Sequence, residues 1–259
     1  MTVEKQFTIH KGDVVALQDE KQRVYLIGTN NSTDKYKGVG VFNPKDLVGK
    51  KYGSQTIIGA KNFFLFPVSI HDALTGLKRK AQIILAKDAG QIIINCSITP
   101  GKKVLEAGIG SGSLTTVLAS IVGETGQVIS YDIREDFIEH AKKNLSTTRL
   151  LNRVTTKNKD VTTGIEENDL DVIILDMPNP WDAIVHAYNA LKPGGYLCTY
   201  SPLISQVEQS VKEMQKHPFV NIKTIETIER EMVVGERGTR PSFNMLGHTG
   251  YLTFARKTL

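Results

Sequence analysis

Short apolar runs and amphipathic stretches alternate from residue 101 onward, and this rhythm constrains the fold more than any other feature of the chain. Runs that fit strands lie at 103–107, 127–132, 153–157, 170–176 and 196–200. Stretches that fit helices lie at 113–122, 135–145, 182–191 and 205–216. Such alternation is typical of an α/β domain in which helices cover both faces of a mainly parallel sheet. The closing strand patterns 220–231 and 248–256 have no helix between them, which predicts an antiparallel edge hairpin joined by a loop over 233–247.

The first hundred residues follow a different pattern. Residues 1–65 contain short β-type runs interrupted by Gly, Asn and Asp, which predicts a small β domain. Residues 78–96 fit one or two helices with a basic start. The chain therefore divides into a β-rich domain over 1–65, a helical linker over 66–100 and an α/β domain over 101–259.

The positive charge of the chain is unevenly distributed. Residues 1–100 carry 14 Lys and Arg against 8 Asp and Glu, whereas residues 101–259 carry 18 against 19. A basic appendage on a nearly neutral core is what an anionic partner such as nucleic acid would favour, although a solvated lysine surface explains the charge equally well.

Composition excludes several classes of protein. No apolar run reaches the roughly 18 residues of a membrane span, and the N-terminus lacks the apolar core of a signal peptide, so we expect no membrane association and a cytoplasmic location. Cys96 and Cys198 lack the spacing of a metal site or a disulfide framework. We expect each to be a small buried side chain, with a bridge between two subunits as the alternative.

A glycine-rich loop lies between the first predicted strand of the α/β region and its first helix. Gly108, Gly110 and Gly112 remove side chains where the backbone must turn and where a ligand must come close. In the Gly-x-Gly-x-x-Gly pattern of dinucleotide-binding proteins, the third glycine would fall at position 113, which is Ser113 here; this disfavours a dehydrogenase. Glu106 ends the strand; pyrophosphate would not tolerate an acid there, whereas a cationic sulfonium would. The loop therefore predicts an S-adenosylmethionine site that includes Glu106.

Acidic residues follow the next strands at matching positions. Asp132 ends the second strand and is placed to hold both ribose hydroxyls of a nucleoside. Asp160 and Val161 follow the third strand and would supply an acceptor for the adenine amino group beside an apolar wall. Asp176 ends the fourth. Three acids at three successive strand ends make the cofactor prediction much stronger than the glycines alone.

The segment 171–181 ends in an acid, two prolines and the only tryptophan of the chain. A rigid loop that presents Asp176 beside Trp181 is suited to hold a planar substrate with an exocyclic amine. The alternative is a capped strand end whose Trp181 belongs to the core. His248 stands alone without a Cys or His partner at ligand spacing, so we expect a structural role for it and no metal site.

These motifs resemble the tRNA (adenine-N1)-methyltransferases, which modify adenine 58 of the tRNA T-loop and, in archaeal members, the neighbouring adenine 57. The resemblance covers nearly the whole chain. Its most specific parts are the Asp-x-Pro-x-Pro-Trp element at 176–181, Arg-Pro at 240–241 and Gly-His-Thr at 247–249; further matches lie at 78–88, 104–113 and 191–195.

The resemblance implies a class I, Rossmann-like methyltransferase core with a mainly parallel seven-stranded sheet, a small N-terminal β domain for RNA binding or assembly, and a homotetramer. It assigns cofactor or active-site roles to Ser111, Gly112, Ser113, Asp132, Asp160, Val161 and Asp176. It places Gln82 on a segment that covers the cofactor. The chain departs from the family at Leu85, where many members have Tyr, so we do not expect an aromatic contact to the target base from this position.

In this interpretation Asp176 is the catalytic residue, because it would accept a hydrogen bond from the adenine N6 amine while N1 attacks the methyl group. The target adenine lies within the tRNA elbow and must be extracted first. Lys78, Arg79 and Lys80 are expected to contact phosphates. Arg240 would touch RNA or a neighbouring subunit, and Trp181 would either wall the base pocket or brace the loop.

Two alternatives remain open. One is a methyltransferase of the same fold that acts on a protein or a small molecule. The other is a non-catalytic RNA-binding subunit of a methyltransferase complex. The presence of the three loop glycines together with Asp132 and Asp176 favours an active enzyme.

Overall fold

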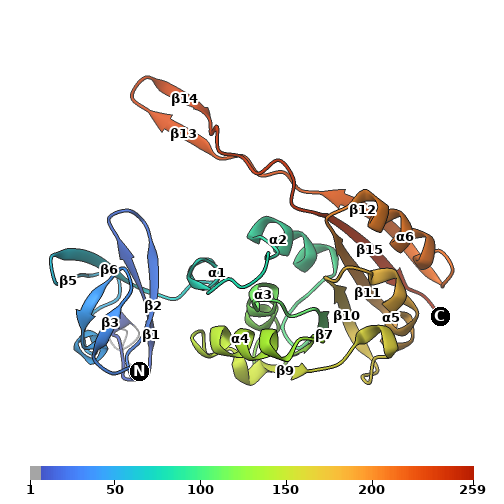
Figure 1. Ribbon diagram of the computed structural model, residues 1–259, viewed down its shortest axis with the longest axis horizontal. Coiled ribbons are helices and arrows are strands. Elements are labelled where there is room, and N and C mark those ends of the chain that lie inside the picture. Colours follow the sequence, from blue (N-terminus) through green and yellow to red (C-terminus); the bar gives the residue numbers. More distant parts are fainter. Residues whose placement is uncertain (1–6) are drawn as a thin grey trace. The chain divides into compact units, whose positions relative to one another are not determined.

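The computed structural model describes residues 7–259 and divides into two units. The first contains residues up to 78 together with 142–151, and the second contains residues 79–141 and 152–259 (Figure 1). The segment 142–151 joins the first unit although the sequence places it in the middle of the α/β region.

The first unit is built on a four-stranded antiparallel sheet with the order β2-β1-β6-β5. Its strands are β1 (Val14–Asp19), β2 (Val24–Gly28), β5 (Gln55–Ile58) and β6 (Lys61–Pro67). The strand pattern places alternate apolar side chains in one core, which includes Val15, Leu17, Ile27, Phe63 and Leu65. The small β region predicted from the sequence is therefore present.

The first unit also contains a short hairpin and two short helices. The strands β3 (Asp34–Tyr36) and β4 (Gly40–Phe42) form a short hairpin, followed by a 3₁₀ helix at Pro44–Leu47. The helix α1 (Ile70–Gly76) begins at a capping box, in which Ser69 and Asp72 satisfy each other's backbone N–H groups. The hairpin and the 3₁₀ helix were not predicted, because they are too short to produce a clear hydrophobic period, whereas α1 lies within the helical linker predicted over 66–100.

The second unit contains a seven-stranded sheet with the order β12-β15-β11-β10-β7-β8-β9. Its strands are β7 (Lys103–Ala107), β8 (Gln127–Tyr131), β9 (Val154–Lys157), β10 (Leu170–Leu175), β11 (Leu191–Ser201), β12 (Phe219–Glu226) and β15 (Tyr251–Lys257). The strands from β9 to β11 pair in parallel, and β15 pairs antiparallel with both β11 and β12. This confirms the predicted α/β class with its antiparallel edge.

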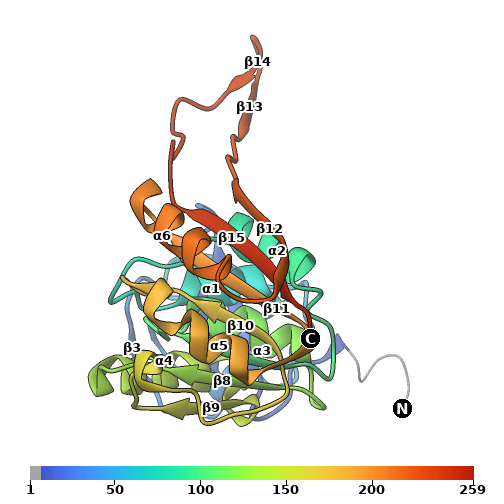
Figure 2. The same ribbon diagram turned by 90° about the vertical axis from the view of Figure 1, so that its right-hand side faces the viewer.

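Helices cover both faces of this sheet (Figures 1 and 2). The helices α3 (Ser113–Val122) and α4 (Glu135–Ser146) lie on one face, and α5 (Ile184–Ala190) and α6 (Ile204–Met214) lie on the other. Short 3₁₀ helices occupy Leu151–Arg153, Val161–Thr163 and Pro180–Ala183. The β10 strand is buried along most of its length, as its continuous apolar run predicts.

The strand order of the seven-stranded sheet indicates where a ligand would bind. In the sheet, β8 lies on one side of β7 and β10 lies on the other. The loops that follow β7 and β10 therefore leave the carboxyl ends of two adjacent strands and run in opposite directions. Ligands bind in open α/β sheets at such a switch point. The glycine loop follows β7 and Asp176 follows β10, so the topology brings the two predicted elements together.

The structure corrects two predictions. Residues 78–85 are not helical, because only α2 (Ala86–Asn95) forms within 78–96. The segment 233–247 is not simply a loop: β13 (Met232–Gly235) and β14 (Gly238–Pro241) pair antiparallel within it. We call residues 227–249 the arm, and both views show it extending away from β12 and β15 (Figures 1 and 2).

Cys96 and Cys198 are both buried free thiols, which agrees with the small buried side chains predicted. None of the helices between residues 7 and 259 combines the length and apolar character needed to cross a bilayer. Within the same residues, no three His, Cys, Asp or Glu side chains converge so as to hold a metal ion.

Candidate active site

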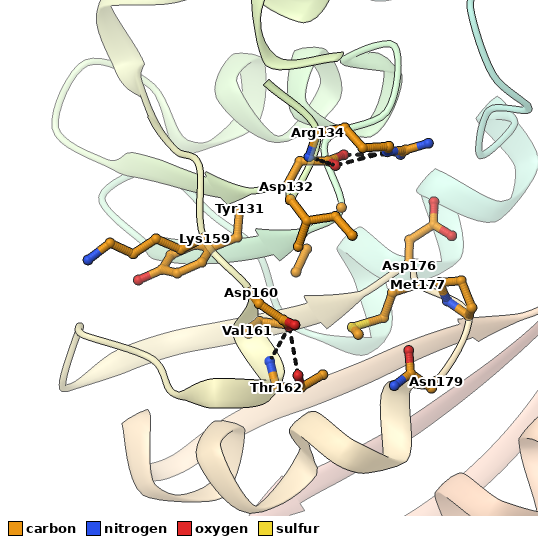
Figure 3. A pocket seen from close by; sticks show the side chains of 14 residues that line it. Tyr131, Asp132, Arg134, Lys159, Asp160, Val161, Thr162, Asp176, Met177 and Asn179 are labelled. Atoms are coloured by element: carbon orange, nitrogen blue, oxygen red, sulfur yellow. Dashed lines mark hydrogen bonds and ion pairs between the residues drawn. The ribbon is translucent and has the colours of Figure 1, made fainter. Parts of the chain in front are cut away.

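A cavity of about 390 Å³ opens at the carboxyl ends of β7, β8 and β10 (Figure 3). Its walls bring together four of the predicted residues with acidic or apolar side chains, Asp132, Asp160, Val161 and Asp176, along with Gly108. Figure 3 shows Asp132 with Arg134 on one side, Asp160 with Thr162 on another, and Asp176 with Met177 on a third. Residues far apart in the sequence thus converge on one site.

The glycine loop makes room for this cavity. The Gly108 N–H donates to the Asp176 carbonyl at 3.0 Å, which joins the loop to the end of β10. A Cβ at Gly108 would lie 3.1 Å from Asp132 Oδ2, so only glycine leaves this approach open. Gly112 precedes α3 with φ +78°, and a Cβ there would also press on Ala141 at 3.2 Å. The loop needs glycine at both positions.

Asp132 is almost completely buried, and its carboxylate is bound by Arg134, two residues later in the sequence. Its Oδ1 accepts from the Arg134 backbone N–H at 3.0 Å and from Nε at 3.1 Å, and its Oδ2 accepts from Nη2 at 3.2 Å. The Arg134 guanidinium lies over the Phe137 ring at 3.6 Å from the ring centroid. Arg134 lines the cavity and was not among the residues predicted from the sequence. Its position two residues after Asp132, on the turn that leaves β8, was the available signal.

The third wall is a turn closed by Asp160. Its Oδ1 accepts from the Thr162 N–H at 2.9 Å and from the Thr162 hydroxyl at 2.7 Å, which caps the 3₁₀ helix that follows. Val161 is buried beside it. The predicted pairing of an acceptor with an apolar wall is therefore present, and the carboxylate also organises its own loop.

Asp176 faces the cavity from the end of β10. Its backbone N–H donates to the Ala107 carbonyl, so the acid is fixed to the strand that carries the glycine loop. Burial, followed by the negative charge of Asp132, raises the pKa of Asp176 to about 7, while Arg134 opposes this shift. Met177 and Asn179 continue the same wall. A carboxylate with a raised pKa in a cleft is typical of a functional site.

Glu106 is buried in β7 and is not among the residues that line the cavity. Its Oε2 accepts hydrogen bonds from the Thr115 hydroxyl at 2.6 Å and from the Ser130 hydroxyl at 2.8 Å. Burial raises the pKa of Glu106 to about 8, although both hydroxyls lower it. The structure therefore gives Glu106 contacts that join β7 to α3 and β8.

The segment 79–85 lies against the glycine loop. The Ser111 hydroxyl oxygen accepts from the Lys80 N–H at 2.9 Å and from the Ala81 N–H at 3.2 Å. The Ser113 hydroxyl donates to the Ile84 carbonyl at 3.3 Å. The two serines of the loop thus hold residues 79–85, which we call the covering segment after the role that the family resemblance implies.

A second, smaller cavity of about 270 Å³ borders the covering segment. Arg79, Gln82 and Leu85 line it from this segment, and Leu246 and Thr249 line it from the part of the arm that leads into β15. Gln82 therefore lies at this cavity and not among the residues that line the first one.

The remaining predicted substrate residues do not line the first cavity. Trp181 packs against the core cluster of the sheet, which supports a role in bracing the loop. Arg240 lies on β14 over the Phe243 ring at 4.1 Å. Lys80 is ion-paired with Asp136, and Lys78 donates its backbone N–H to Asn144 Oδ1 at 3.3 Å.

The first cavity fits S-adenosylmethionine. Its volume lies within the roughly 300–1,000 Å³ of small-molecule sites. Asp132 offers carboxylate oxygens for ribose hydroxyls, Asp160 and Val161 offer an acceptor beside an apolar surface, and the missing Cβ of Gly108 leaves the space between Asp132 and Asp176 open. These residues would hold the cofactor.

The chain is similar to known methyltransferases in sequence and in fold. Residues 73–239, well over half of the chain, match the family model of the GCD14 subunit of the tRNA methyltransferase complex. The chain is 37% identical to the tRNA (adenine(57)-N(1)/adenine(58)-N(1))-methyltransferase TrmI of Methanocaldococcus jannaschii, with 93% of each chain covered.

Two solved structures are also similar over nearly the whole chain. A SAM-dependent O-methyltransferase from Thermotoga maritima is 31% identical with a TM-score of 0.87, covering 100% of this chain and 98% of that one. The tRNA (m1A58) methyltransferase TrmI from Aquifex aeolicus is 25% identical with a TM-score of 0.78, covering 97% and 99%. With a seven-stranded methyltransferase sheet, a cavity at its switch point and these matches, the chain belongs to the family of the tRNA methyltransferase GCD14 subunit.

Proposed function

We propose that this protein transfers a methyl group from S-adenosylmethionine to N1 of adenine 58 in the T-loop of tRNA, and to the adjacent adenine 57 where one is present. The observation that carries the proposal is the position of Asp176, which faces the cofactor cavity from a strand end joined to the glycine loop. The relative from M. jannaschii, whose name includes both adenines, supports the same substrate.

The chemistry requires position and charge stabilisation more than proton transfer. When bound, S-adenosylmethionine supplies an electrophilic methyl group on a positively charged sulfur. Adenine N1 carries a lone pair at neutral pH and needs no general base. Asp176 would accept a hydrogen bond from the N6 amine, orient the ring and stabilise the positive charge that develops on the purine. Pro178 and Pro180 restrict the backbone that follows Asp176, and misplacement in such an attack can cost about 100-fold in rate.

Basic surfaces would contact the RNA backbone. In the first unit, Lys35, Lys37 and Lys61 border a groove of about 540 Å³ beside Tyr36. Lysine side chains around a groove with a neighbouring aromatic ring suit phosphate and base contacts. The exposed Lys78, Arg79 and Lys80 provide a second basic group. These surfaces support a role of the β-rich region in RNA binding.

The arm supports assembly into a homotetramer. Its apolar side chains are unusually exposed: Met232 at 57%, Val234 at 79% and Phe243 at 83%. Apolar groups gathered on an extended hairpin favour burial against other subunits. Light scattering of the pure protein would give the mass of the assembly, and replacing Val234 and Phe243 by Ser should reduce it.

Methylation of tRNA transcripts tests the substrate. The wild-type protein should label a transcript with adenine at 57 and 58, and mass mapping should place the methyl group at N1 of adenine 58. Replacing adenine 58 with guanine removes that product, and replacing adenine 57 shows whether it is a second site. Equal labelling of all these transcripts would place the methyl group at another nucleotide and contradict the proposal, whereas an absence of labelling in every transcript would favour a protein or small-molecule substrate. A protein that binds no S-adenosylmethionine in calorimetry would instead be a non-catalytic subunit.

A further inference from the structure

A buried ion pair lies at the start of α2, outside the cofactor cavity. The Lys87 side chain is 8% exposed and the Asp88 side chain is fully buried. Lys87 Nζ donates to Asp88 Oδ1 and Oδ2 at 2.8 and 2.9 Å, to the Thr227 carbonyl at 2.7 Å and to Thr249 Oγ1 at 2.7 Å. The Thr249 hydroxyl in turn donates to Asp88 Oδ2 at 2.9 Å. Buried charges require such complete pairing, and the network therefore fixes one geometry.

This network joins three segments of chain. Lys87 and Asp88 belong to α2, Thr227 directly follows β12 at the start of the arm, and Thr249 is the last residue of the arm before β15. The two ends of the arm are also joined, because His248 Nδ1 bonds Oε1 of Glu226, the last residue of β12, at 2.6 Å. The root of the arm is therefore fixed to α2 at both of its ends.

The same network connects the two walls of the second cavity. Gln82 and Leu85 line that cavity from the covering segment, which leads directly into Lys87, while Leu246 and Thr249 line it from the arm. The covering segment is itself held on the glycine loop by Ser111. A displacement of Thr249 would thus separate the two walls without changing the lining of the first cavity.

We propose that Lys87, Asp88 and Thr249 are positioning residues for the methyl transfer, because they hold the covering segment and the root of the arm in the spacing that admits the RNA substrate. The proposal rests on the tRNA methyltransferase function given above. None of the three lines the cofactor cavity, so their effect should fall on RNA and not on S-adenosylmethionine.

The test compares Thr249→Val with Thr249→Ser in steady-state methylation of tRNA. Val keeps the shape of Thr and removes the hydroxyl, whereas Ser keeps the hydroxyl. We expect T249V to raise KM for tRNA about tenfold, the usual scale for one lost hydrogen bond to a charged group. T249S should recover most of this loss. The Kd for S-adenosylmethionine should stay within about threefold of wild type in both variants.

A matched control removes an ion pair elsewhere. Lys102 pairs with Asp171 at 3.0 Å near the opposite ends of β7 and β10, so Lys102→Met should lower the melting temperature and leave KM for tRNA unchanged. If T249V also lowers only the melting temperature, or if it weakens S-adenosylmethionine binding as much as tRNA binding, the positioning role is wrong. If the wild-type protein does not methylate tRNA, the proposed function fails and the positioning role fails with it.

Lys87→Met gives a second measurement. It leaves Asp88 buried without its cation, so we expect a less stable protein, and kinetics are read at a temperature where circular dichroism shows it folded. Under those conditions the KM for tRNA should rise at least as much as in T249V. A folded K87M with wild-type KM for tRNA would overturn the proposal.

Discussion

The guanidinium of Arg134 binds both carboxylate oxygens of Asp132, with Nε 3.1 Å from Oδ1 and Nη2 3.2 Å from Oδ2. This bidentate pair holds the acid that we expect to bind the cofactor ribose in one orientation at the cavity wall. Oδ1 also accepts from the Arg134 backbone N–H, so Oδ2, whose second contact is a long one from the Gly110 N–H at 3.4 Å, is the oxygen that would receive a hydroxyl group. Asp132 is therefore oriented before any ligand arrives.

Asp132→Ala should weaken S-adenosylmethionine binding by roughly 10–100-fold, because charge-assisted hydrogen bonds to hydroxyl groups are lost. Calorimetry measures this directly. Arg134→Met is the matched change, since it keeps the carboxylate and removes only its orienting partner; we expect a loss of about threefold or less. A larger loss in the Arg134 variant than in the Asp132 variant would show that the guanidinium itself carries the binding.

Asp176→Ala should keep most cofactor affinity and lower methyl transfer to tRNA at least about 100-fold, the scale found when one aligned electrostatic group is removed. Single-turnover assays with labelled methyl groups give the rate, and calorimetry gives the affinity. Glu208→Gln changes an exposed acid on α6 and should leave both values unchanged. Unaltered turnover in the Asp176 variant would exclude the proposed role.

The pKa of Asp176, about 7, predicts a pH dependence of the rate. Only the ionised acid carries the negative charge that stabilises the positive charge developing on the purine, so the single-turnover rate should rise with pH up to about 7 and then level off. The folding stability should change with pH in the opposite direction to the rate. The folded pKa exceeds the ordinary value of 3.8, so the folded protein binds more protons between the two values and its free energy of unfolding falls as pH rises through this range. Asp176→Asn should remove this contribution, which urea titrations at several pH values would reveal.

Two hydrogen-bond acceptors favour the protonated form of His248. Its Nδ1 faces the Glu226 carboxylate at 2.6 Å and its Nε2 faces the Pro202 carbonyl at 2.8 Å; both partners are acceptors, so both ring nitrogens must donate. The Glu226 hydrogen bond, followed by that to Pro202, raises the pKa of His248 above 6.5. The stability that this gives to the arm root is complete below 6.5 and is lost as pH rises through the folded pKa. Titration of the ring by NMR should give a value above 6.5, and Glu226→Gln should lower it; an unchanged value would refute the pairing.

Gly108→Ala should abolish cofactor binding in a folded protein, because its Cβ would approach Asp132 Oδ2 to 3.1 Å and enter the cavity. Gly90→Ala is a control with the opposite expectation. A Cβ at Gly90 meets no atom within 4 Å, and the residue lies inside α2, so alanine should stabilise the protein by about 0.5–1 kcal/mol. Thermal melts and cofactor titrations of both variants check these outcomes.

The sequence predicted those parts of the fold that depend on local periodicity. The bounds of β7 and α3 agree with the predictions for 103–107 and 113–122, because a buried strand and an amphipathic helix each carry a complete hydrophobic pattern. The helix predicted for 78–85 is absent. There, the Ser111 hydroxyl, about 30 residues further along the chain, accepts from the Lys80 and Ala81 N–H groups and holds the segment on the glycine loop. The arm hairpin was missed because its strands pack on no core that would impose alternation.

By itself the sequence determined which residue types stand at each strand end, and so the chemistry of the site: glycines after β7 and acids after β8, β9 and β10. Only the tertiary structure decided which of them meet. It placed Asp132 and Asp176 on one cavity, Glu106 outside its lining and Trp181 against the core, and it added Arg134. It also joined Lys87 to Thr249 across more than 160 residues. The physical reason is that burial and hydrogen bonding act between residues that are close in space, and strand order, which no local pattern records, sets that closeness.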